Sequence, residues 1–137
     1  MTDEALVLDA NDSFYRIIRQ GDFQAMEALW SSNRAVHCTH PGWSTLSDRA
    51  SVMRSWRMIL GQEIPPQIWP DEARVILTGE TAMVLCVEHL DRDDLMASNS
   101  FVREDGLWRM LSHQASVMPV AFQRCLSTYS TQKYKNI

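Results

Sequence analysis

The chain has 137 residues, a formal net charge of -4 and a hydrophobic fraction of 45%, as expected of an ordinary soluble globular protein. A chain of this length fits one domain, and such a domain buries about two-thirds of the surface that its unfolded chain exposes. The 13 Lys and Arg residues are scattered, which argues against a nucleic-acid-binding face. Three cysteines without a C-x-x-C motif, an acidic N-terminus and no long apolar run predict a cytoplasmic protein that does not enter a membrane.

Two helices are predicted before residue 31. Apolar residues recur at helical spacing from near Asp3, and Gly21 stands where a left-handed helix end is favoured. Asp22 can then cap a second, short helix. The buried stripes of these helices are predicted to contain Leu6, Ala10, Phe14, Ile17 and Ile18, and then Phe23, Met26, Leu29 and Trp30.

A short strand and a third helix follow. The strand is predicted over residues 35–39, and Pro41-Gly42 turns the chain. Ser47 or Asp48 can cap the third helix, which ends near Gly61. Its buried face is predicted to contain Val52, Trp56, Ile59 and Leu60.

From Gln67 onward the apolar period changes to two, which is typical of strands. The predicted strands are 69–77, 82–90, 95–103 and 107–117, with turn signals at 78–79, 91–94 and 105–106. Consecutive hairpins of this kind form an antiparallel sheet. The residues after Pro119 lose the periodicity, so we expect one domain over 1–119 and a partly mobile C-terminal tail over 120–137.

The strand predicted over 82–90 is apolar on both faces. Ala82, Val84 and Cys86 alternate with a second apolar set, Met83, Leu85 and Val87. Because the helices can cover only one face of the sheet, the other face is expected to be buried by a second copy of the chain, as a homodimer.

Several segments resemble the SnoaL-like branch of the nuclear-transport-factor-two-like superfamily. The matching pieces are Gly21-Asp22 through Leu29-Trp30, His40-Pro41-Gly42, Trp56, Glu88, Asn99 through Phe101, and Trp108 through Ser116. The resemblance implies an α+β fold in which three N-terminal helices pack on a strongly curved antiparallel sheet, forming a cone with an internal apolar pocket. This scaffold carries isomerases, dehydratases, binding proteins and association domains, so function has to be argued from the pocket residues.

Aromatic and polar side chains are candidates for lining that pocket. Trp43 follows a Pro-Gly turn, where a large apolar side chain has little reason to lie unless something packs on it. Trp30 lies in a regular apolar stripe that is more typical of a core. The predicted ligand-binding residues are Phe14, Trp30, Trp43, Trp56, Glu88, His89, Phe101 and His113.

Glu88 lies among apolar residues, so its carboxylate must reach solvent or find a partner. A catalytic role and an ion pair with an arginine later in the sheet are both open. The register of the 91–94 loop decides which face Glu88 occupies. One register places Glu88 on the same face as Asn99, and a change of one residue places His89 there instead.

The candidate catalytic residues are His40 and Asn99. In ketosteroid isomerase, which shares this scaffold, an Asp before the proline of the corresponding segment removes a proton, and an acidic residue two before a Phe helps to hold the enolate oxygen. The resemblance places His40 and Asn99 at these positions, where an imidazole with a pKa of about 6.5 can act as a base and an amide can donate. The tyrosine of that oxyanion site corresponds to Phe14, and the adjacent Tyr15 is expected to point elsewhere.

His37, Cys38 and His40 are residue types that bind zinc. Since His37 and Cys38 point to opposite faces of a strand, and no further ligand stands at a recognisable spacing, we predict neither a metal nor a cofactor. The sequence favours binding of a small, largely apolar organic molecule by a homodimer. A cofactor-independent isomerase or dehydratase acting next to a carbonyl, and a protein-association domain, remain as alternatives.

Overall fold

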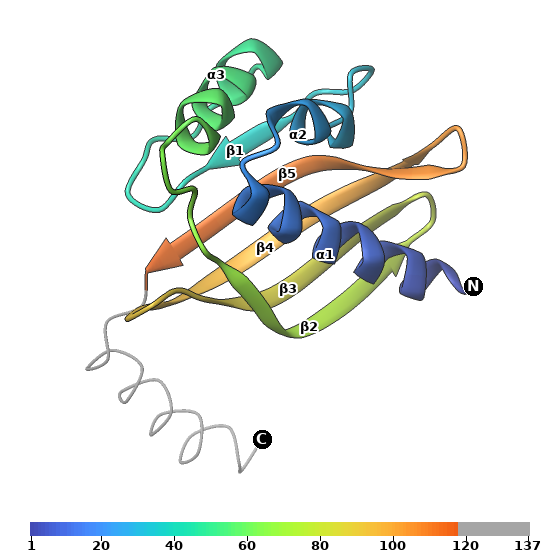
Figure 1. The fold of residues 1–137 in the computed structure, drawn as a ribbon. Coiled ribbons are helices and arrows are strands. Elements are labelled where there is room, and N and C mark those ends of the chain that lie inside the picture. The colour runs from blue at the N-terminus through green and yellow to red at the C-terminus, as the bar shows by residue number, and fades with distance from the viewer. Residues whose placement is uncertain (118–137) are drawn as a thin grey trace.

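Three helices lie on one face of a five-stranded sheet in the computed structural model, which describes residues 1–117 (Figure 1). The expected domain boundary at 119 and the expected tail, 120–137, lie outside the described residues. The helices are α1 (Asp3–Gln20), α2 (Phe23–Leu29) and α3 (Arg49–Leu60), and the strands are β1 (His37–Thr39), β2 (Trp69–Thr78), β3 (Thr81–His89), β4 (Asp94–Glu104) and β5 (Leu107–Val117).

The helices begin and end where local chemistry favours it. The side chains of Thr2, Asp22 and Asp48 accept hydrogen bonds from backbone N–H groups in the first turns of α1, α2 and α3. Gly21 ends α1 with a φ of 66°, and its N–H donates to the carbonyl of Ile18. Gly21 and the cap at Asp22 together fix the sharp reversal between α1 and α2.

The sheet has the strand order β1-β5-β4-β3-β2, and β2 to β5 form the predicted antiparallel run of hairpins. β1 pairs with β5 in parallel, so the sheet as a whole is mixed. The sheet curves around α1, which lies across its concave face (Figure 1). The structure therefore confirms the α+β cone. No helix within residues 1–117 is long and apolar enough to cross a membrane.

The register between β3 and β4 decides which residues face the helices. Glu88 pairs with Leu95, and Val84 pairs with Asn99. Because paired residues share a face, Glu88 and Asn99 both point into the cone, and His89 lies on the outer face. The inner residues of β3 are buried together with the apolar stripes of the helices.

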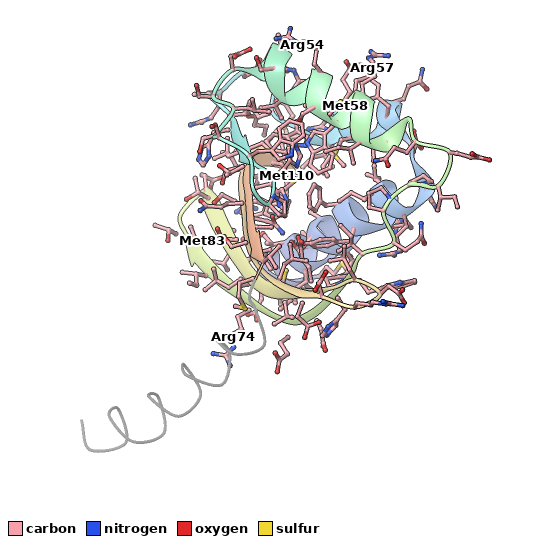
Figure 2. The ribbon with its side chains drawn as sticks, turned by 90° about the vertical axis from the view of Figure 1, so that its left-hand side faces the viewer. Arg54, Arg57, Met58, Arg74, Met83 and Met110 are labelled. Carbon is pink, nitrogen blue, oxygen red and sulfur yellow. The ribbon has the colours of Figure 1, made fainter. Side chains whose placement is uncertain are left out.

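The outer face of the sheet carries apolar side chains that no described residue covers. Ile76, Met83, Leu85 and Met96 are between 37% and 51% exposed. Figure 2 shows Met83 and Arg74 on this side of the sheet, away from the helices. β3 is thus apolar on both faces, as the alternation predicted, and one face is open in the isolated chain.

The junction between α1 and α2 should tolerate no side chain at Gly21. A Cβ there would lie 2.8 Å from Pro65 Cγ and 3.0 Å from the Leu60 carbonyl oxygen. Gly79 has a similar φ of 59° but has nothing within 4 Å, which makes it a matched control. We expect Gly79→Ala to lose about 1 kcal/mol of unfolding free energy and Gly21→Ala to lose at least about 2 kcal/mol, measured by urea unfolding. Equal losses would contradict this account of the junction.

Candidate functional site

A pocket of about 290 Å³ opens into the cone between the helices and the sheet. An apolar cavity of about 150 Å³ holds a benzene ring, and ligand pockets start near about 300 Å³, so this pocket suits a molecule of one or two rings. Its walls are formed by Ile18, Pro41, Trp43, Trp56, Ile59, Pro66, Ile68, Leu90 and Leu95, and its polar groups come from His40, Gln62, Glu88 and His113.

Glu88 is a carboxylate that is only 2% exposed. Tyr15 of α1 donates a hydrogen bond to its Oε2 at 2.6 Å. Burial raises the pKa of Glu88 to about 7, although the hydrogen bond from Tyr15 acts in the opposite direction. The carboxyl group is therefore present in both protonation states near neutral pH.

Within the described residues, Glu88 forms no ion pair with an arginine of the sheet. Arg103 pairs with Asp3 and Glu80 at the other end of the sheet, and Arg109 donates to the carbonyl of Ala28. Glu88 is bonded to a neutral donor instead, so no positive side chain compensates its charge when the carboxyl group is ionised.

Asn99 links Tyr15 to His113. Its Nδ2 donates to Tyr15 Oη at 3.0 Å and to Asn11 Oδ1 at 2.9 Å, while its Oδ1 lies 2.6 Å from His113 Nδ1. Since an amide oxygen only accepts, His113 Nδ1 carries the proton and Nε2 is left as an acceptor. We call Glu88, Tyr15, Asn99 and His113 the buried polar chain.

His113 stays neutral because its surroundings disfavour a charge. Burial, and then repulsion from the nearby His40, lower the pKa of His113 to about 3. The residue is 3% exposed, and its ring lies 4.9 Å from that of Phe14. A neutral His113 bonded through Nδ1 thus presents one defined tautomer to the pocket.

His40 is fixed by α3. Its Nε2 lies 2.8 Å from Ser55 Oγ, and Ser55 donates its own hydroxyl hydrogen to the Val52 carbonyl at 2.6 Å. His40 Nε2 must therefore be the donor to Ser55. Burial lowers the pKa of His40 to about 4, so this ring is also neutral at neutral pH. Its edge-to-face contacts with Trp43 and Trp56 have centroid distances of 4.9 and 4.7 Å.

The predicted site residues other than His89 occupy three different environments. The pocket wall contains His40, Trp43, Trp56, Glu88 and His113. Phe14, Asn99 and Phe101 are fully buried and do not line the pocket. Trp30 belongs to the core: it is 1% exposed, and its Nε1 donates to Met26 Sδ.

His89 does not line this pocket. Its side chain is on the outer face of the sheet, where Nδ1 lies 2.7 Å from Asp94 and Nε2 lies 3.0 Å from Asp71. The cause is the register of β3 and β4, which turns Glu88 inward and its neighbour outward.

The expectation that Tyr15 points elsewhere is wrong. Tyr15 is fully buried, and its hydroxyl bonds to Glu88 and Asn99. A signal was present in the sequence, because Asn11 and Tyr15 stand four residues apart on one helix face and are the polar groups of that face. The same contacts occupy the amide of Asn99, so it has no free donor for a substrate oxygen.

Within the described residues there is no group of three or more His, Cys, Asp or Glu side chains that could hold a metal ion. His37 is exposed and Cys38 is buried, in keeping with their opposite directions on β1. Burial raises the pKa of the Cys38 thiol to about 12, so this thiol stays protonated beside His40.

A curved sheet closed by three helices around a pocket defines the nuclear-transport-factor-two-like class of fold. A model of the SnoaL-like domain family matches residues 7–121, and the chain belongs to this family. The structure is similar to that of a proposed dehydratase of the NTF2-like family from Streptomyces avermitilis, with 32% sequence identity and a TM-score of 0.79, covering 86% of this chain and 97% of that one.

Two further similar proteins carry descriptions other than dehydratase. A proposed calcium/calmodulin-dependent protein kinase type II association domain from Thiobacillus denitrificans is 27% identical, with a TM-score of 0.71, covering 80% of this chain and 93% of that one. The F-box protein SKIP8 of Arabidopsis thaliana is 28% identical over 120 residues, which is 86% of this chain and 52% of that protein. The chain thus spans about half the length of this relative.

The raised pKa of Glu88 should appear in the pH dependence of stability. Its pKa moves from 4.5 to about 7 on folding, so its contribution is complete below the lower value and is lost as the pH rises through the higher one. Relative to Glu88→Gln, the wild type should lose up to about 3 kcal/mol of unfolding free energy between about pH 4.5 and pH 8.

Urea unfolding of both proteins across this range measures the difference. His40 and His113 have lowered pKa values, which act in the opposite sense as the pH falls, but both residues are present in each protein and their effects cancel. A difference between the two proteins that does not change with pH would show that Glu88 is not desolvated.

Proposed function

We propose that this protein binds a small, largely apolar organic molecule in the pocket of the cone. The observation that carries the proposal is an open pocket of about 290 Å³ with apolar walls and polar groups from β3, β5 and the turn before α3. A domain used only for association could fill this space with side chains. Similar structures include both a proposed dehydratase and a proposed association domain, so the pocket itself favours ligand binding.

Trp43 supports this function. It is 40% exposed at the mouth of the pocket, and its ring contacts His40 at its edge. A large aromatic side chain left exposed beside an apolar pocket gains free energy when a ligand covers it. Trp56, by contrast, is 2% exposed and packs against Phe14 as well as lining the pocket.

Trp43→Ala should therefore weaken binding while leaving stability almost unchanged. We expect a loss of affinity of about tenfold for neutral molecules of one or two rings, 4-ethylphenol and 4-ethyltoluene among them, measured by titration calorimetry. Met58→Ala is the control, because Met58 is 59% exposed on α3 and is not one of the residues that line the pocket.

Trp56→Ala should lose both binding and stability, the latter by about 3 kcal/mol or more for a packed aromatic. If no molecule of this panel binds the wild type, the proposed function is wrong. If Trp43→Ala and Met58→Ala bind alike, Trp43 has no part in the site.

The protein is proposed to act as a homodimer that buries the outer face of the sheet. Ile76, Met83, Leu85 and Met96 form an exposed apolar patch there, and a two-fold interface would cover the same patch on both copies. The cytoplasmic location expected from the sequence stays a prediction.

Sedimentation should report a dimer at micromolar concentration, and Leu85→Glu should dissociate it because a carboxylate would be placed opposite its symmetry-related copy. Met58→Glu, on the opposite side of the molecule, should remain dimeric. A wild-type protein that sediments as a monomer would remove the proposal without affecting the pocket.

A second candidate is proton transfer next to a carbonyl, as in a cofactor-independent isomerase or dehydratase. The observation that favours it is Glu88, whose pKa of about 7 suits a general base at neutral pH. His40, the base expected from the sequence, is held by Ser55 and is less basic.

Catalysis of this kind would exchange the hydrogen on the carbon next to a carbonyl with solvent deuterium, which NMR detects with a panel of small cyclic ketones. The wild type should show exchange that rises through about pH 7, and Glu88→Gln should lose it by at least about a hundredfold. His40→Ala and Asn99→Ala test the pair suggested by the sequence. An absence of exchange in the wild type would leave this protein as a binder.

A further inference from the structure

We propose that the pocket selects neutral molecules that carry a hydroxyl group, phenols and alcohols, and that this hydroxyl donates its hydrogen to Nε2 of His113. The inference rests on the proposed ligand binding and names the chemical class of the ligand. It follows from the polar groups of the pocket wall and from what each of them already bonds.

The buried polar chain fixes the hydrogen-bonding character of His113. Tyr15 gives its hydrogen to Glu88 at 2.6 Å and accepts from Asn99 Nδ2 at 3.0 Å, which orients the amide. The amide oxygen then accepts from His113 Nδ1 at 2.6 Å. Because the ring is neutral, Nε2 is an unprotonated acceptor, and it has no hydrogen-bond partner within residues 1–117.

The other polar groups of the pocket are mostly acceptors as well. In its ionised form Glu88 accepts from Tyr15 through Oε2 and retains Oε1 as a free acceptor. His40 commits its only N–H to Ser55. A ligand that supplies a donor satisfies these free acceptors, whereas a ligand that brings only an acceptor leaves the lone pairs of His113 Nε2 and of the ionised Glu88 unpaired.

One donor in the pocket wall lacks an acceptor. Trp56 lines the pocket and is 2% exposed, and its Nε1 has no partner in the part of the chain that the structure describes. The Trp56 and His113 rings lie 5.9 Å apart between centroids. This Nε1 atom is itself enclosed by neighbouring side chains, so the preference for a hydroxyl group rests on His113 Nε2 and not on the Trp56 N–H.

Charge excludes the alternative of an acidic ligand. No Lys or Arg is among the described residues that line the pocket, whereas Glu88 is. A carboxylate or phosphate would be desolvated beside a carboxyl group and would have no cation to pair with. The ligand should therefore be neutral, and the pocket volume of about 290 Å³ sets its size at one or two rings.

The test compares three probes of similar shape: 4-ethylphenol, 4-ethyltoluene, in which a methyl group replaces the hydroxyl, and 4-ethylbenzoate. Affinities are measured by calorimetry for the wild type and for His113→Leu at neutral pH. The ratio of the phenol affinity to the toluene affinity should fall about tenfold in His113→Leu, the value of one hydrogen bond to a buried acceptor. 4-Ethylbenzoate should bind at least about a hundredfold more weakly than 4-ethylphenol.

A second measurement keeps the proposal testable if His113→Leu does not fold. Long-range ¹H–¹⁵N spectra of the wild type should show His113 protonated at Nδ1. Its Nε2 resonance should move when 4-ethylphenol binds and much less when 4-ethyltoluene binds. Asn99→Leu should abolish the single tautomer, which a role for Asn99 in packing alone would not do.

The outcomes separate this inference from the function on which it rests. Equal phenol-to-toluene ratios in wild type and His113→Leu, with both probes bound, would overturn the hydroxyl preference and leave ligand binding intact. A proton on His113 Nε2 in the free wild type would overturn it as well. Failure of all neutral probes to bind would overturn both proposals.

Discussion

The burial of Glu88 beneath α1 is the constraint on which the site depends. A carboxyl group that is 2% exposed has to be met by a donor, and α1 supplies it through Tyr15. That hydroxyl in turn orients Asn99, and Asn99 orients His113. The buried polar chain thus connects α1 to β3, β4 and β5, and loss of any one member leaves a buried polar group unpaired at a cost of about 1–3 kcal/mol.

Replacing buried charged or polar groups by apolar side chains of similar volume is often neutral or stabilising. The polar chain nevertheless ends at the pocket, and Trp56, in the same wall, leaves an indole N–H unpaired. Such costs are typical of functional sites, where stability is given up for a defined arrangement of polar groups. Met83 and Leu85 are exposed on the outer face of the sheet, so the proposed dimer interface and the proposed ligand site lie on separate surfaces.

Much of the fold follows from signals that are local in the chain. The alternation of apolar residues predicts a strand over 107–117, and β5 has those bounds. Gly21, Asp22 and Asp48 act at helix ends for reasons contained within one turn of helix. Nearly all of the aromatic and polar residues predicted for the site point into the cone. In a small cone the inward-facing side chains form both the core and the pocket wall.

Only the tertiary structure decided which of two adjacent residues faces the pocket. Glu88 and His89 exchange faces with a one-residue change of register, and that register is set by how β3 pairs with β4 across the 91–94 loop. Phe14 and Tyr15 are both buried, so helical periodicity could not show which of them reaches the sheet residues Glu88 and Asn99. The parallel pairing of β1 with β5 joins residues far apart in sequence. The sequence by itself determined the elements and their apolar faces, since these depend on near neighbours, whereas the polar contacts of the site depend on how separate elements pack together.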